Sequence, residues 1–171
     1  ESKLFYIDEL VDNNKFNDLN IFNTANKKAI IGISGNNDKE LIIKILTAIK
    51  KNFIPALQPP QIETKKLLKL YKKIGCVGAY INNIFYEFDN IYWNNPKFDL
   101  VMFSSGSTGE PVPLGIKFSS ILDNAQQVKE FLKLQSKEKH IGSFSMCYMS
   151  GFYNAFLLPL LTEGVPIVSN Q

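Results

Sequence analysis

The sequence predicts an open, largely parallel α/β sheet with helices on both faces. Short apolar runs alternate with segments of helical length and periodicity along most of the chain. Strands that alternate with helices in this way are typical of parallel sheets, because each helix carries the chain back to the start of the next strand. The runs 29–31 and 100–103 contain no polar residue, as expected for strands covered on both faces.

The individual elements follow from apolar spacing and from the residues that end each run. Strands are predicted at 29–34, 54–57, 77–81, 84–88, 100–103, 114–118, 142–146 and 166–168. Helices are predicted near 7–12, from Asp38 as far as Ile49, and at 63–74, 120–134 and 152–161.

Capping residues mark several of these helix ends. Gly35-Asn-Asn-Asp38 is a predicted capped helix start, because Asn and Asp side chains can accept from the free N–H groups of a first turn. Gly75 is a predicted C-cap, where a left-handed backbone suits glycine. Ser120-Ile-Leu-Asp123 is interpreted as a capping box.

Composition indicates a soluble globular domain of ordinary type. Hydrophobic residues make up 45% and charged residues 20% of the chain, with a net charge of +3, which favours no nucleic-acid partner. One basic cluster is interpreted as a solvated helix face: Lys65, Lys66, Lys69, Lys72 and Lys73. No run approaches the roughly 18 apolar residues that span a membrane.

The cysteines and the single histidine carry no recognisable catalytic or metal motif. Cys76 and Cys147 are too far apart in sequence for a close-spaced metal or redox pair. Two buried free thiols are the simplest interpretation, and with no signal peptide apparent they indicate a cytoplasmic protein. His140 is predicted to lie at a helix end or turn and not to be catalytic.

The most informative stretch is Ser104-Ser-Gly-Ser-Thr-Gly-Glu-Pro111, which follows an apolar strand. Glycines let a backbone approach a ligand closely, and successive N–H groups with small hydroxyls can hold phosphate oxygens. A Walker P-loop is excluded, because that motif needs a lysine and a helix after its last glycine. Here prolines follow, and a returning strand is predicted instead. A dinucleotide-binding turn at 32–35 is not favoured either, because its glycine pattern is incomplete.

This stretch resembles the phosphate-binding signature of the adenylate-forming superfamily, [ST]-S-G-[ST]-T-G-x-P-K, over eight consecutive positions. This superfamily includes acyl-CoA synthetases, acyl-carrier-protein ligases, nonribosomal adenylation domains and luciferases. Further resemblances to the superfamily lie upstream, at 29–55 and Gln58-Pro-Pro60, and downstream, at 143–151 and 157–168.

The resemblance extends over residues 27–171 and implies the N-terminal part of an AMP-binding domain. Residues 1–26 are then a leader packed on that domain. The later motifs of the superfamily are absent, namely Y-G-x-T-E, the ribose-binding T-G-D and the segment with the catalytic lysine. The resemblance therefore implies an incomplete enzyme that lacks a later subdomain and a C-terminal lid, and whose isolated 171 residues are inactive.

The resemblance also implies an activity for the complete protein, which is a ligase that activates a carboxylic acid with ATP and Mg²⁺. The acid would form an acyl-adenylate and then pass to a thiol, either of coenzyme A or of phosphopantetheine on an acyl carrier protein. The phosphate-binding residues implied are Ser104, Ser105, Gly106, Ser107, Thr108 and Gly109. Tyr148 and Gly151 would border the acyl pocket, and no residue is identified as a general acid or base.

The sequence departs from the superfamily pattern at two positions. Val112 replaces the basic residue that closes the phosphate signature, and Tyr148 replaces a histidine beside the carboxylate pocket. These departures leave open an alternative, a non-catalytic homologue that binds nucleotide or acyl groups. The identity of the acid and of the acceptor stays open as well.

Overall fold

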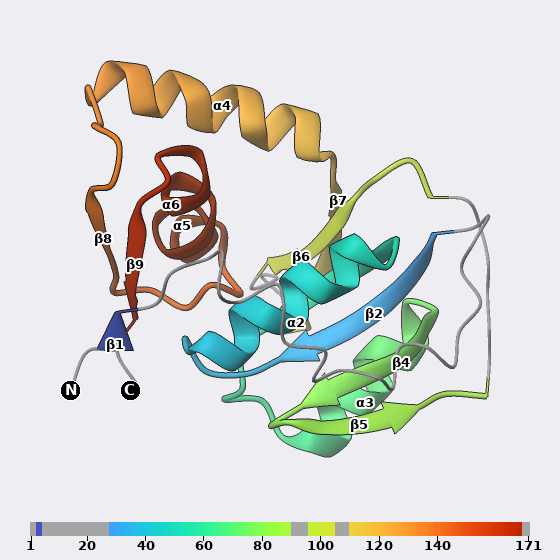
Figure 1. Cartoon of the computed structure of the whole chain (residues 1–171). Helices are drawn as coiled ribbons and strands as arrows, with labels where there is room; N and C mark the ends of the chain where they lie inside the picture. Colours follow the sequence, from blue (N-terminus) through green and yellow to red (C-terminus); the bar gives the residue numbers. More distant parts are fainter. Residues whose placement is uncertain (1–2, 5–27, 90–95, 105–109, 169–171) are drawn as a thin grey trace.

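A computed structural model of the chain describes residues 3–4, 28–89, 96–104 and 110–168 (Figure 1). The predicted fold class is confirmed. A six-stranded sheet has the order β5-β4-β2-β3-β6-β7, and a smaller three-stranded sheet has the order β1-β9-β8. The predicted helix at 7–12 and most of the predicted leader lie outside the described residues.

The large sheet is parallel at its centre and antiparallel at both edges. Strands β4, β2, β3 and β6 run in parallel, while β5 and β7 return as antiparallel neighbours of β4 and β6. Its strands are β2 (Ala29–Ser34), β3 (Phe53–Gln58), β4 (Cys76–Ile81), β5 (Ile84–Glu87), β6 (Leu100–Ser104) and β7 (Val112–Ile116). The predicted return strand at 114–118 was therefore placed too late, because Phe118 already begins a helix.

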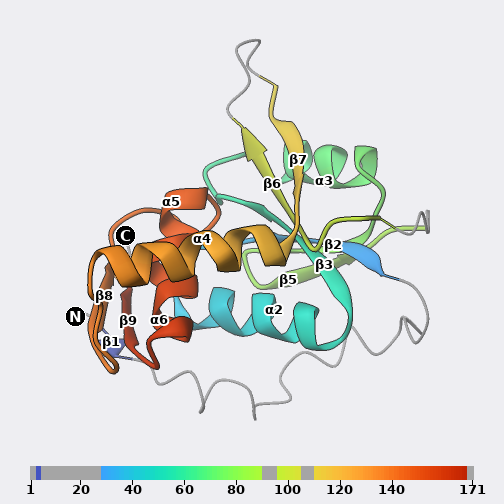
Figure 2. The same cartoon turned by 90° about the horizontal axis from the view of Figure 1, so that it is seen from above.

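Helices α2 (Lys39–Lys50) and α3 (Thr64–Lys73) cover opposite faces of this sheet (Figures 1 and 2). The side chains of each strand alternate between the faces, so they enter different cores. Ile31 and Ile33 pack in the core that contains α2, whereas Ile54 and Ala56 pack with α3. The helices on both faces explain why the central strands are almost wholly apolar.

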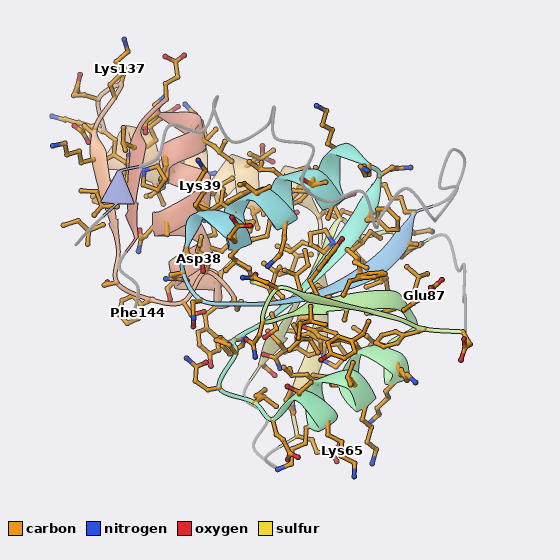
Figure 3. All side chains as sticks on the ribbon, turned by 60° about the horizontal axis from the view of Figure 1, so that its bottom comes forward. Asp38, Lys39, Lys65, Glu87, Lys137 and Phe144 are labelled. Atoms are coloured by element: carbon orange, nitrogen blue, oxygen red, sulfur yellow. The ribbon has the colours of Figure 1, made fainter. Side chains whose placement is uncertain are left out.

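Both helices begin or end as their capping residues predict. Asp38 is the N-cap of α2, and its carboxylate accepts a hydrogen bond of 2.8 Å from the N–H of Leu41. Gly75 follows α3 in the left-handed region, with φ of 79°. The lysines of α3 are solvent-exposed, as predicted, and Lys65 points away from the sheet (Figure 3).

A second lobe contains the small sheet and the last helices, at the left of Figure 1. Its elements are α4 (Phe118–Phe131), β8 (Lys139–Gly142), α5 (Met149–Phe152), η2 (Tyr153–Leu157), α6 (Leu158–Leu161) and β9 (Val165–Val168). Helix α4 is tied to the other helices by polar contacts as well as packing. The Tyr153 hydroxyl donates to the Ile121 carbonyl at 3.1 Å, and Lys129 Nζ donates to the Leu161 carbonyl at 3.1 Å. Strand β1 (Lys3–Leu4) pairs antiparallel with β9.

The prediction of a capping box at Ser120 is wrong. Helix α4 begins at Phe118, without a side-chain cap from its own N-cap residue, Lys117. Instead Asp99 Oδ2, which precedes β6, accepts a hydrogen bond of 3.0 Å from the Phe118 N–H. The helix also ends at Phe131, before the predicted Leu134, because Lys133 has a left-handed φ of 54°.

Two further boundaries were wrong in the second lobe. The strand predicted at 142–146 was placed too late: β8 pairs with β9 from Lys139 to Gly142, and residues 143–146 form a loop. His140 therefore lies in a strand and not at a helix end or turn. The helix predicted at 152–161 begins earlier, at Met149, and contains a π turn in which the Leu158 N–H donates to the Tyr153 carbonyl. This wider turn lies just before Pro159, which has no N–H to continue the regular ladder.

None of the described helices is both long and apolar enough to cross a membrane.

Candidate functional site

The predicted phosphate loop connects two paired strands. β6 and β7 form an antiparallel hairpin whose last pair joins Ser104 to Val112. Ser104 is exposed at the carboxyl end of β6, which is the end at which ligands bind in parallel α/β sheets. Residues 105–109, which carry Ser105, Gly106, Ser107, Thr108 and Gly109, lie outside the described part of the chain. Their contact with phosphate therefore stays a prediction.

A cation from another element lies at the base of this loop. Lys73 Nζ, at the end of α3, is 3.5 Å from the Glu110 carboxylate, and both side chains are largely exposed. Such a pair contributes at most about 1 kcal/mol to stability. Lys73 could not be recognised as a site residue from the sequence, because only the fold brings the end of α3 to Glu110. Val112, which replaces the basic residue of the signature, is 47% exposed.

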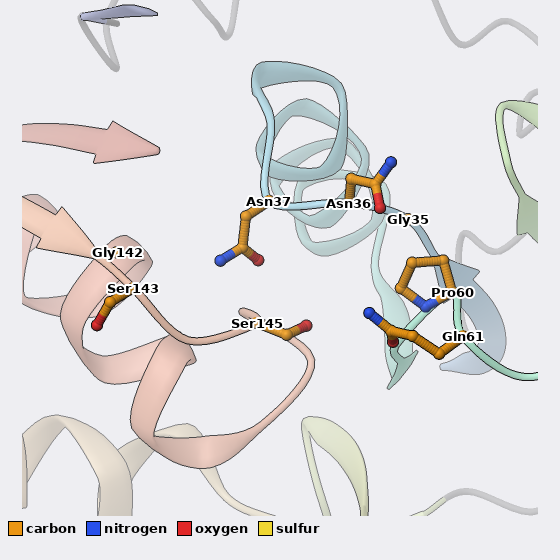
Figure 4. A pocket seen from close by; sticks show the side chains of 8 residues that line it. All are labelled: Gly35, Asn36, Asn37, Pro60, Gln61, Gly142, Ser143 and Ser145. Carbon is orange, nitrogen blue, oxygen red and sulfur yellow. The ribbon is translucent and has the colours of Figure 1, made fainter. Parts of the chain in front are cut away.

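The first part of the second predicted motif (143–151), residues 143–148, is held against the turn between β2 and α2. Asn37 Nδ2 donates to the Phe144 carbonyl at 2.5 Å, and Asn37 Oδ1 accepts from the Met146 N–H at 2.6 Å. Figure 4 shows the Asn37 side chain directed toward the segment that carries Ser143 and Ser145. From the sequence, Asn37 was recognisable only as part of a helix start, because its partners lie more than half of the chain away.

Tyr148 and Gly151 have different surroundings. Tyr148 is 48% exposed, and as the N-cap of α5 its backbone N–H donates to the Ser145 carbonyl at 3.0 Å. Gly151 is buried in α5, directly below the same segment. A Cβ on Gly151 would lie 2.0 Å from the Ser145 carbonyl oxygen, so this close approach requires glycine. The structure thus brings both residues together, with the Tyr148 side chain open to solvent.

A small polar cavity of about 50 Å³ opens beside Asn37 (Figure 4). It lies at the carboxyl ends of β2 and β3, where the second lobe meets the large sheet. Its walls carry amides and hydroxyls: Gly35, Asn36, Asn37, Pro60, Gln61, Gly142, Ser143 and Ser145. This lining can donate and accept hydrogen bonds but contains no charged side chain, so the cavity suits water or a neutral polar group.

Several buried polar groups lie near the same end of the sheet. Lys44 of α2 is only 2% exposed and donates from Nζ to Asn83 Oδ1. Burial lowers the pKa of the Lys44 ammonium, and the negative charges of Asp38 and Glu40 partly offset this effect. Ser34 Oγ, at the end of β2, is buried without a hydrogen-bond partner in the described part of the chain.

Both thiols are free and buried, as predicted. Burial raises the pKa of Cys147 to about 12, and it also raises the pKa of Cys76. Thiols with such high pKa values are protonated near neutral pH and are poor nucleophiles. Neither cysteine is therefore a catalytic candidate.

His140 has a structural partner in the second lobe. Its Nε2 lies 2.9 Å from Thr162 Oγ1, whose hydroxyl donates to the Leu158 carbonyl. The histidine is therefore the donor to Thr162, and burial lowers its pKa. Among the described residues, no three His, Cys, Asp or Glu side chains are grouped to hold a metal ion.

Comparisons with known proteins give matches among solved structures only. No protein-family model matches the chain, and no curated protein matches it. ATP-bound MatB from Rhodopseudomonas palustris matches with a TM-score of 0.63 and 10% identity, over 81% of this chain and 34% of that one. MenE from E. coli with bound OSB-AMS matches with a TM-score of 0.65 and 13% identity, over 85% and 36% of the two chains.

A third match is the adenylation domain of a keto acid-selecting NRPS module, bound to a keto acyl adenylate. Its TM-score is 0.60 and its identity is 11%, over 85% of this chain and 33% of that chain. These are adenylate-forming enzymes. The fold is that of their N-terminal part. The fold that the resemblance implies is thereby confirmed, and this chain spans about a third of the length of these matched structures.

Proposed function

We propose that this chain is the N-terminal part of an ATP-dependent ligase that activates a carboxylic acid. The observation that carries the proposal is the position of the serine- and glycine-rich signature. It connects β6 to β7 at the carboxyl end of a parallel strand, in a fold shared with enzymes solved with ATP or with an acyl adenylate. At 10% and 11% identity with this chain, the matched structures support the fold, and the signature adds the residues that would contact phosphate.

The proposed reaction has two steps. A carboxylate oxygen of the acid attacks the α-phosphorus of ATP, a P–O bond to pyrophosphate breaks, and an acyl-adenylate forms. The sulfur of coenzyme A or of a carrier-protein phosphopantetheine then attacks the acyl carbonyl. AMP leaves, the thiol proton passes to solvent, and a thioester remains.

The loop has a positioning and electrostatic role in this proposal. Ser104, Ser105, Ser107 and Thr108 offer hydroxyl donors, and Gly106 and Gly109 let backbone N–H groups approach the β- and γ-phosphates. Donors fixed in place before the reaction stabilise charge on the leaving pyrophosphate and keep it in line with the attacking carboxylate. Mg²⁺ bound with ATP would offset further phosphate charge.

The acid would bind near Tyr148 and Gly151. Tyr148 offers a neutral phenol hydroxyl that can donate one hydrogen bond, where the superfamily pattern has a histidine. A neutral donor recognises a carboxylate without adding a positive charge. We therefore propose an acid site that differs from that of relatives with the histidine.

A non-catalytic homologue is the second candidate, and Val112 is the observation that favours it. Its exposed side chain offers no charge to a nucleotide at the position where the signature has a basic residue. Such a homologue would bind nucleotide or an acyl group without exchange of pyrophosphate.

ATP–pyrophosphate exchange distinguishes the two candidates. The assay uses the longer polypeptide, that is, the complete protein of which this chain is proposed to be the N-terminal part. The assay uses a panel of acids such as acetate, malonate and benzoate. A ligase shows exchange that depends on one of the acids and falls about tenfold or more in Thr108→Ala. Ser136→Ala removes an exposed hydroxyl after α4 and serves as the control. No acid-dependent exchange from a folded protein that binds ATP would favour the non-catalytic homologue.

A further inference from the structure

Asn37 forms a long-range contact that none of the recognised motifs explains. It lies in the turn between β2 and α2, and its side-chain amide binds backbone groups that lie 107 and 109 residues further along the chain. Its neighbour Asn36 lines the same cavity but makes neither of these bonds. The contact is therefore specific to one of two adjacent asparagines.

The geometry of the contact reproduces one step of a β-ladder. In a parallel sheet, a residue donates to the carbonyl one position before the residue beside it and accepts from the N–H one position after that residue. Here the Asn37 amide takes the place of one residue, as it donates to the carbonyl of Phe144 and accepts from the N–H of Met146. The segment thus gains a fixed position although it is a loop.

The position of Tyr148 depends on the same segment. The Tyr148 N–H donates to the Ser145 carbonyl at 3.0 Å, and the Cys147 N–H donates to Ser145 Oγ at 3.2 Å. Ser145 lies between the two residues that Asn37 binds, and its carbonyl group rests on Gly151. Met146 and Cys147 are buried, whereas Tyr148 is exposed.

We propose that Asn37 is a positioning residue that fixes the 143–148 segment and, through it, sets Tyr148 at the acid-binding site. The part that concerns the acid rests on the function proposed above. The part that concerns the segment does not, because it follows from the hydrogen bonds alone. Asn37 itself touches no reacting atom in this proposal.

Hydrogen exchange tests the structural part on this chain without any activity assay. In Asn37→Ala, exchange of the backbone N–H groups of 144–148 should become at least about tenfold faster, while α2 and the large sheet keep their protection. Asn37→Asp keeps the acceptor for Met146 but loses the donor for Phe144, so a smaller increase is expected. Asn36→Ala should leave these N–H groups unchanged. Unchanged exchange in the folded Asn37 variants would overturn the proposal.

Steady-state exchange kinetics test the part that concerns the acid, in the longer polypeptide. Asn37→Ala should raise KM for the acid about tenfold and leave KM for ATP within about twofold. If Asn37 had only a structural role, the variant would contain less active enzyme, but KM for the acid would not rise relative to KM for ATP. Where Asn37→Ala fails to fold, Asn37→Asp carries the same comparison.

The outcomes separate this inference from the proposed function. An unchanged KM for the acid, in an enzyme that catalyses exchange, would overturn the role of Asn37 and leave the ligase intact. No acid-dependent exchange by the wild type would overturn the ligase and, with it, the acid-binding part of the inference. Hydrogen exchange would still decide whether Asn37 holds the segment.

Discussion

Gly151 allows a loop to cross directly over the first turn of α5. An added Cβ would lie 2.0 Å from the carbonyl oxygen of Ser145 and 2.6 Å from that of Phe144. Both contacts are with backbone atoms, which cannot turn aside as a flexible side chain would. The loop would have to move as a unit, together with the Asn37 hydrogen bonds that hold it.

We expect Gly151→Ala to lower the free energy of unfolding by about 3 kcal/mol or more, since overpacking against a backbone is costly. Chemical denaturation measures the change. Gly35→Ala is a matched control, because its Cβ would have its nearest neighbour, Leu41 Cδ1, at 3.7 Å. A similar loss of stability in both variants would contradict this explanation.

Cys147 makes stability depend on alkaline pH. Burial raises its pKa from 9.0 to about 12 in the folded protein. The unfolded thiol loses its proton near pH 9 while the folded thiol keeps it. The unfolded state is therefore increasingly favoured as pH rises from about 9 toward 12. The contribution of the Cys147 thiol to the free energy of unfolding is fully present only below that range.

Unfolding free energies measured between pH 8 and pH 10 should fall by about 1 kcal/mol because of Cys147 alone. Cys147→Ala removes this group, so the variant should lose less stability over the same range, whatever its starting value. An equal slope in the two proteins would show that the thiol does not contribute. The pKa of Cys76 is also raised, so Cys76 adds to the pH dependence of the unfolding free energy in both the wild type and Cys147→Ala.

Among the elements, α4 shows how one helix depends on a residue outside it. Asp99 precedes β6, and its carboxylate binds both Lys28 Nζ and the Phe118 N–H. The hydrogen bond from Lys28 is the main cause that lowers the pKa of Asp99. The Asp99 carboxylate therefore stabilises the fold at pH values above the pKa of the unfolded carboxyl group. This contribution to the free energy of unfolding is lost as pH falls through the lower pKa of the folded protein.

Asp99→Ala should destabilise the protein by about 1–2 kcal/mol, the usual cost of a lost N-cap. Asp99→Asn keeps an acceptor for Phe118 and should lose less. Asp123→Ala, at the exposed position of the predicted capping box, should change stability by no more than about 0.5 kcal/mol. Thermal or chemical unfolding compares the three variants. A larger loss at Asp123 than at Asp99 would contradict the assignment of the cap.

The accuracy of the sequence predictions follows the range of the interactions. The start of α2 and the end of α3 were predictable, because Asp38 and Gly75 each act within one turn of their own position. The start of α4 was not, because its cap comes from Asp99, 19 residues away. The residues at 143–146 were mistaken for part of a strand, because their alternating apolar residues suit one. Their loop conformation is held in part by Asn37, which lies more than 100 residues earlier.

At the scale of the whole molecule, the candidate site is divided between two lobes. The signature loop leaves the large sheet, whereas Tyr148 and Gly151 belong to the second lobe. The sequence predicted both motifs through their resemblance to one superfamily. It did not predict Lys73, Asn37 or Lys44 as part of this region, because their partners are set by how the elements pack.

The 171 residues alone should catalyse no ATP–pyrophosphate exchange, although they fold. The chain spans only 34% of ATP-bound MatB, and we propose that adenine binding and the later chemistry need the remainder. Circular dichroism confirms folding in the same sample that is assayed with the acid panel. Acid-dependent exchange by this isolated chain would show that these residues suffice and would contradict the proposal.

The pairing of β1 with β9 has a consequence for synthesis on the ribosome. Lys3 pairs with Val168 and Leu4 with Ile167, so the first strand has no partner until the last one has been made. At about 5–20 residues per second, that delay is roughly ten to thirty seconds. The central strands of the large sheet can assemble during this time. The unpaired N-terminal strand then offers a free edge on which a chaperone could act until β9 leaves the ribosome.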